Sequence, residues 1–112
     1  MGALAVIDVH DGHTRRRHEV TRWPVRVGRA LDCDIVLDDP HVAAHHLTLA
    51  ADGTVEAAAS VNGARVGHAR LAPGARAAWP ADTPLHLGKA SLHIRRLDDP
   101  LAPEQALAGR GR

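Results

Sequence analysis

Arg29 and Asn62 are the side chains of this sequence whose types and positions best suit the binding of an anion. Arg29 follows Gly28 at the end of an apolar segment, and Asn62 precedes Gly63 in a tight-turn sequence. A guanidinium group makes charge-assisted, bidentate hydrogen bonds of the kind that phosphate and carboxylate oxygens accept. Arg29 and Asn62 could therefore bind an anion such as phosphate if the fold brings their two loops to the same end of the domain.

Metal binding is a second chemistry to consider, because His41, His45 and His46 lie close together in the sequence. Residues 45 and 46 would point to opposite faces of an extended strand. No cysteine or carboxylate completes a familiar zinc-ligand spacing with them. We therefore expect no metal site, and we interpret the histidines as surface residues.

An enzyme has the least support in the sequence. Besides the threonines, the candidate nucleophiles are Ser60, Ser91 and Cys33, and none lies in the glycine frame of a nucleophile elbow. The carboxylates of Asp32 and Asp34 would disfavour the Cys33 thiolate. No glycine-rich nucleotide loop occurs either. We expect no catalytic residue and no cofactor.

Short β-strands separated by turns account for most of the chain. Asp11-Gly12, Asp52-Gly53 and Asn62-Gly63 are strong turn signals, and Pro24 favours an edge strand or the start of a strand. The segments that we predict as strands are residues 3–9, 14–20, 21–27, 34–37, 46–50, 54–58 and 91–97. This pattern, without a convincing helix, predicts an all-β sandwich or barrel.

The last residues differ from the rest of the chain. The sequence from Pro103 to Ala108 resembles the start of a helix, which would end at Gly109. We expect residues 1–97 to form the domain and residues 98–112 to be a linker or flexible tail with at most one or two helical turns. Such a tail is consistent with a domain of a larger protein.

Composition limits the size and the partners of the domain. A chain of 112 residues has room for one modest core, and Trp23 and Trp79 are its only aromatic residues, so valine, leucine and isoleucine must supply most of that core. The net charge is +1, which gives no general basic surplus for nucleic acid. We interpret the arginines at 15–17 as the solvated side of an early strand.

The sequence also suggests a compartment. Cys33 is the only cysteine, which excludes an internal disulfide and fits a reducing cytoplasm. Asp8 and His10 interrupt the apolar run that a signal peptide would need. No segment approaches the roughly 20 apolar residues that cross a bilayer. We expect a cytoplasmic domain without direct membrane insertion.

The turns, strands and loop residues together resemble the forkhead-associated (FHA) domain, an eleven-stranded β-sandwich that binds phosphothreonine peptides through loops at one end. The resemblance covers residues 5–97 and implies two antiparallel sheets of ten or eleven short strands. The matching residues, in order, are Gly28-Arg29, Asp34-Ile35-Val36-Leu37 with Asp39, Val42, His46, Asn62-Gly63, Leu71 with Pro73-Gly74, and Leu85 with Gly88.

The resemblance also implies roles for single residues. Arg29 would contact the phosphate, and Asn62 would hold the backbone of the bound peptide. His46 would maintain the geometry of the binding loop without touching phosphate. Gly28 and Gly63 would be the turn glycines that the family places beside these residues.

Two loop sequences depart from the family pattern. The first loop usually reads Val-Ser-Arg/Asn-x-His, with a serine hydroxyl that binds the phosphate, whereas here Ala43 and Ala44 follow Val42. The second usually reads Ser-Thr-Asn-Gly, and here Val61 replaces the threonine. A hydrogen bond to a charged group contributes roughly 1.5–3 kcal/mol, so losing two or three of them would weaken binding about a hundredfold or more.

Two functions follow from these departures, both with a protein or peptide as the partner. In the first, which we favour, the domain docks without phosphate, as in FHA-like domains of some bacterial secretion machines. Ala43, Ala44 and Val61 suit this role because they make the loop end more apolar.

The alternative is a phosphothreonine reader in kinase signalling or secretion regulation. Arg29 and Asn62 would bind the peptide, and His45 or Arg65 would supply the missing donors. A structural role for Arg29, in which it pairs with Asp32 or Asp34, remains open beside both functions.

Overall fold

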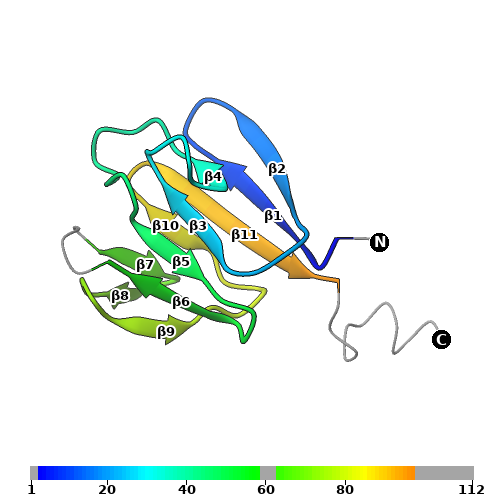
Figure 1. Ribbon diagram of the computed structural model, residues 1–112. Helices are drawn as coiled ribbons and strands as arrows, with labels where there is room; N and C mark the ends of the chain where they lie inside the picture. Colours follow the sequence, from blue (N-terminus) through cyan, green and yellow to red (C-terminus); the bar gives the residue numbers. More distant parts are fainter. Residues whose placement is uncertain (1–2, 59–62, 98–112) are drawn as a thin grey trace, which may run out of the picture.

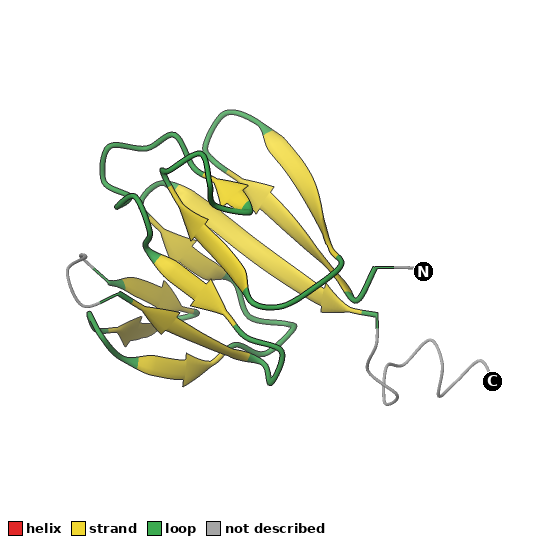
Figure 2. Cartoon of the chain, viewed as in Figure 1, coloured by secondary structure: helices red, strands yellow, loops and turns green. Residues whose placement is uncertain are grey.

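The computed structural model describes residues 3–58 and 63–97, which form two packed sheets without a helix (Figures 1 and 2). The six-stranded sheet has the order β2-β1-β11-β10-β7-β8, and the five-stranded sheet has the order β4-β3-β5-β6-β9. The strands of the first sheet are β1 (Ala5–His10), β2 (Arg15–Val20), β7 (Ala64–Val66), β8 (Ala69–Leu71), β10 (Leu85–Leu87) and β11 (Ala90–Arg96). Those of the second are β3 (Val25–Gly28), β4 (Ile35–Val36), β5 (Leu47–Leu49), β6 (Thr54–Ala57) and β9 (Arg76–Ala78).

The architecture confirms the predicted all-β sandwich, with one correction to the sheets. Strand β4 pairs with β3 in parallel, so the five-stranded sheet is mixed and only the six-stranded sheet is wholly antiparallel. The backbone N–H groups of Asp34 and Leu37 donate to the carbonyls of Arg26 and Gly28, and the chain therefore returns alongside β3 in the same direction. The predicted third strand also begins late, at Val25, directly after Pro24.

Alternation of buried and exposed residues explains how the sheets pack. In β11, Leu92 and Ile94 are buried and His93 and Arg95 are exposed, as the sequence predicted. The inner faces supply a core of valine, leucine and isoleucine, which Trp79 joins at 4% exposure. Trp23 is only partly buried against this core.

The loops that carry most of the predicted site residues meet at one end of the sandwich. The loop between β3 and β4 lies against the loop that leads into β5, because Arg29 N–H donates to the Ala43 carbonyl at 2.9 Å. His46, at the end of the second loop, contacts the Gly63 carbonyl just before β7. One end of the two-sheet sandwich therefore gathers the segments around residues 29–34, 41–46 and 63 (Figure 1).

Leu92→Ala tests the position of the core. Leu92 is fully buried on β11, so its truncation should lower the free energy of unfolding by about 2–5 kcal/mol in a urea titration. His93→Ala, one residue further and on the exposed face, should change it by less than about 0.5 kcal/mol. Equal effects of the two variants would contradict the register of β11.

Candidate functional site

A backbone contact fixes the two loops that flank Arg29. Arg29 N–H donates to the Ala43 carbonyl at 2.9 Å, and Ala30 N–H donates to the Ala44 carbonyl at 3.1 Å. A Cβ atom at residue 28 would lie 2.2 Å from the Ala44 carbonyl oxygen. Glycine is therefore required at this position for the loops to approach so closely.

His46 joins the first loop to the segment that enters β7. Its side chain is 1% exposed. Ala43 N–H donates to its Nδ1 at 3.0 Å, and its Nε2 donates to the Gly63 carbonyl at 2.9 Å. Burial lowers the pKa of the imidazole, in keeping with a neutral ring that carries its proton on Nε2. The Ala43 N–H is consequently already bonded within the protein.

Asp39 performs a similar task on the other side of the loop. Its carboxylate is buried and accepts backbone N–H groups of Lys89 at 2.8 Å and His41 at 2.9 Å. These hydrogen bonds lower the pKa of Asp39, and the bond from Lys89 has the larger effect. The sequence singled out Asp39 as a matching residue but gave no sign of its partner, which lies 50 residues away in the turn between β10 and β11.

His45 is engaged with Asp32. Its Nε2 lies 3.0 Å from Asp32 Oδ1, and both side chains are more than half exposed. Cys33 lies beside this pair, and its thiol donates a hydrogen bond to the Ala44 carbonyl at 3.2 Å. The atoms of Asp32, Cys33 and His45 that could bind a metal ion lie within 4.8 Å of one another. Burial, and then the charge of Asp32, raise the pKa of Cys33, so its thiol is a buried hydrogen-bond donor.

The sequence did not foresee this group, because its members are separated along the chain. It includes neither His41 nor His46, the other two histidines weighed as metal ligands. The expectation of no metal site remains a prediction.

Arg29 has an exposed side chain and forms no ion pair among the residues that the structure describes. Asp32 pairs instead with His45, and Asp34 accepts the backbone N–H of Arg26 at 2.9 Å. Neither carboxylate therefore binds the Arg29 guanidinium, which leaves its donors available to a ligand.

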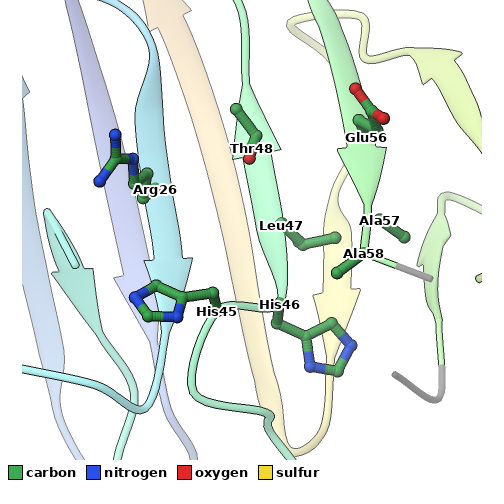
Figure 3. A pocket seen from close by; sticks show the side chains of 8 residues that line it. All are labelled: Arg26, His45, His46, Leu47, Thr48, Glu56, Ala57 and Ala58. Atoms are coloured by element: carbon green, nitrogen blue, oxygen red, sulfur yellow. The ribbon is translucent and has the colours of Figure 1, made fainter. Parts of the chain in front are cut away.

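A hollow lies over the five-stranded sheet, next to the loop end (Figure 3). The ring of His45 points toward β3 and that of His46 points away from it, toward the end of β6. The remaining lining residues are Arg26, Leu47, Thr48, Glu56, Ala57 and Ala58. Arg29 does not line this hollow, so an anion held by Arg29 would lie at the loop tips and not within it.

The structure thus brings six of the nine predicted loop residues to one place: Gly28, Arg29, Ala43, Ala44, His46 and Gly63. His45 lies in the same loop but pairs with Asp32. Val61 and Asn62 fall outside the described residues, and their predicted contacts stay predictions.

Comparison with known proteins gives a consistent set of relatives. The family model for the cytoplasmic domain of the inner membrane component of T3SS, the type III secretion system, matches residues 10–98. The FHA domain-containing protein FhaB of Mycobacterium tuberculosis is 32% identical over 85 residues, which cover 73% of this chain and 54% of FhaB. The chain thus spans about half the length of that relative.

Solved structures show the same fold. The FhaA FHA domain complexed with the intracellular domain of Rv3910 has a TM-score of 0.69 at 22% identity, covering 81% of this chain and 99% of that one. Mycobacterium tuberculosis EmbR in complex with a low affinity phosphopeptide has a TM-score of 0.69 at 24% identity, covering 81% of this chain and 24% of EmbR. The part of the chain that the structure describes contains no helix long and apolar enough to cross a membrane.

The neutral, buried state of His46 predicts a pH-dependent variant. His46→Gln leaves Ala43 N–H without its acceptor and should cost about 1–3 kcal/mol of unfolding free energy at pH 7.5. Because the folded pKa is lowered, the unfolded chain binds the extra proton, and wild-type stability from this residue is lost as pH falls below about 6.5. The difference between wild type and variant should therefore shrink toward pH 5 in urea titrations. A difference that stays constant with pH would show that His46 is not held neutral.

Proposed function

This chain is an FHA domain that belongs to the family of the cytoplasmic domain of the T3SS inner membrane component, and on this premise we propose that it docks a protein partner without requiring phosphothreonine. FHA domains are non-catalytic interaction modules, so the function is binding and not a reaction. The described relatives include one FHA domain complexed with a protein domain and another protein bound to a phosphopeptide. We further propose that residues 1–97 are the interaction domain and that it acts in the bacterial cytoplasm.

The observation that carries the proposal is the state of the loop at residues 41–46. Ala43 and Ala44 have no side-chain donors, and the Ala43 N–H is bonded to His46. His45, which the sequence offered as a replacement donor in this loop, is held by Asp32. A phosphate at the loop end would therefore meet Arg29 without the hydroxyl contact that the family pattern provides, and with the carboxylate of Asp32 nearby.

An apolar contact suits the same loop end better. Leu31 lies between Arg29 and Asp32 and is 90% exposed. Among the described residues, it is the one large hydrophobic side chain that is exposed. Ala44 is exposed in the neighbouring loop, and its carbonyl is tied to Ala30. A partner that covers Leu31 and Ala44 would bury apolar surface, which stabilises a complex without any phosphate.

Phosphothreonine binding is the second candidate function, and the free Arg29 side chain favours it. Arg29 would supply the charge, and Asn62, whose placement is not described, would hold the peptide backbone. Arg65 does not strengthen this candidate, because it pairs in register with Arg70 and His86 on the outer side of the six-stranded sheet.

A titration followed by amide chemical shifts separates the two functions. We expect a degenerate phosphothreonine peptide pool at about millimolar concentration to cause no shifts beyond those of the same pool without phosphate, because one guanidinium contributes only roughly 1.5–3 kcal/mol. Phosphate-dependent shifts confined to Arg29 and Ala43–His46, and abolished by Arg29→Ala, would overturn the proposal in favour of the reader.

The matched control restores the family residues. Ala43→Ser with Val61→Thr should create phosphate-dependent binding. Each added hydroxyl should improve the binding free energy by about 1 kcal/mol or more, which is about fivefold in affinity. Arg29→Ala in this background should remove it. If the restored variant also stays silent, the loops differ from the family geometry, and the alanines are not the reason for silence.

A photo-crosslinking amino acid at Leu31 tests docking directly. In cells of the source bacterium, it should give a protein adduct that phosphatase treatment before illumination leaves unchanged. A second probe at Ala51, an exposed residue between β5 and β6, is the control for random capture. Loss of the adduct after phosphatase treatment, or equal capture from Ala51, would contradict phosphate-independent docking at the loop end.

A further inference from the structure

The six-stranded sheet carries a second charged surface, which the loop end does not explain. Residues directly opposite each other in antiparallel strands place their side chains on the same face. The registers of β2, β1, β11, β10, β7 and β8 connect six such residues into one row that crosses the whole sheet. We define this basic row as Arg15, His10, Ser91, His86, Arg65 and Arg70.

The basic row lies on the outer face of the sheet. Its neighbours along the strands, such as Val9, Leu92 and Leu85, are core residues, whereas the arginines and His10 are exposed and Ser91 and His86 are partly exposed. Five strand spacings of about 4.8 Å give the row a length of about 24 Å. Two open hollows lie along it, one at His10, Arg15 and Ser91 and the other at Arg65, Arg70 and His86.

No acidic side chain interrupts the row. Three of its six members are arginines, and none of their side chains forms a hydrogen bond or ion pair within the described residues. Asp8, the acidic residue nearest in register on the same face, is already paired with Arg17 at 3.3 Å. The row therefore presents positive charge that the protein itself leaves uncompensated.

The corresponding row of the other sheet shows that this pattern is not general. There, Arg26, Thr48, Glu56 and Arg76 are aligned in register, and the carboxylate of Glu56 lies between the two arginines. The chain as a whole has a net charge of only +1, so the row is a local feature of one face and not the result of a general basic surplus. The loop between β3 and β4, in contrast, carries the exposed carboxylates of Asp32 and Asp34.

The twist of the sheet selects the shape of the ligand. Neighbouring strands are rotated by roughly 20–25°, so the side chains at the two ends of the row point in directions that differ by about 100°. The change of strand direction between β2 and β8 is visible in Figure 1. A planar membrane could not contact both ends at once, whereas an extended polypeptide of about seven residues could follow the row.

We propose that the basic row binds an extended acidic segment of a partner protein. Glutamate and aspartate side chains on one side of the segment would pair with Arg15 at one end and with Arg65 and Arg70 at the other. The histidines and Ser91 would provide hydrogen bonds in between. This surface is separate from the docking residues Leu31 and Ala44. Experiments can therefore disprove the docking proposed for the loop end and still support binding at the basic row.

The test uses a fluorescent peptide of about ten residues with alternating glutamate and serine, and the same peptide with glutamine in place of glutamate. At about 50 mM salt the acidic peptide should bind and the neutral one should not, and salt near 0.5 M should abolish binding. Amide shifts should follow the strands of the six-stranded sheet. No binding at about 1 mM peptide, or equal binding of both peptides, would overturn the proposal.

Matched variants distinguish the row from general attraction. Arg65→Gln with Arg70→Gln should weaken the acidic peptide about fivefold or more, which corresponds to two exposed charge pairs. Arg22→Gln with Arg76→Gln removes the same charge from exposed positions elsewhere and should leave affinity within about twofold. Equal weakening by both pairs would overturn the proposal, as would tighter binding of phosphatidylglycerol vesicles or of duplex DNA through the same arginines.

Discussion

The loop end of this domain depends on a buried imidazole that must stay neutral. His46 accepts a hydrogen bond from the loop that precedes β5 and donates one to the segment that enters β7, so a single ring connects the two sheets where the loops of the predicted site emerge. A protonated ring would lose its acceptor and place an uncompensated charge in the core. Asp39 makes the equivalent connection to the turn before β11, with the opposite chemistry of a carboxylate that must stay charged. Low pH therefore acts against both connections.

The sequence predicted seven of the eleven strands that the structure describes, because turn residues and alternation are local signals. The four strands that it missed, β7, β8, β9 and β10, have three residues each, which is too short to show a clear alternation. Asp-Gly pairs marked the turns between β1 and β2 and between β5 and β6, and buried positions spaced by two residues marked β11. The parallel pairing of β4 was not predictable in this way, because two residues carry no pattern that distinguishes parallel from antiparallel partners. The site could likewise be predicted only where neighbouring residues in the sequence carried the signal. Ala43 could be placed from its neighbours, but the bond from Asp32 to His45 and the bond from Asp39 to Lys89 join distant segments, and only the fold brings them together.

Charge segregation connects the two proposed surfaces. Asp32 and Asp34 lie in the loop between β3 and β4, and the basic row crosses the six-stranded sheet, so the two proposed surfaces differ in their charged groups. Such a domain is suited to hold two different segments of an assembly at once. The T3SS inner membrane component and the FhaB protein of Mycobacterium tuberculosis are similar to this chain, and a shared fold does not by itself fix what each protein binds.

The thiol of Cys33 can report on the motion of the two loops at the loop end. Its Sγ is hydrogen-bonded to the Ala44 carbonyl, and its burial keeps it protonated. Cys33 is 7% exposed and its Sγ bonds to the neighbouring loop, so an alkylating reagent should react with it faster when the loop at residues 41–46 separates from the loop at residues 29–34. The rate of modification therefore measures how often the two loops part, and a partner that clamps them together would slow it. Cys33 is therefore a built-in probe of how often the loop end opens.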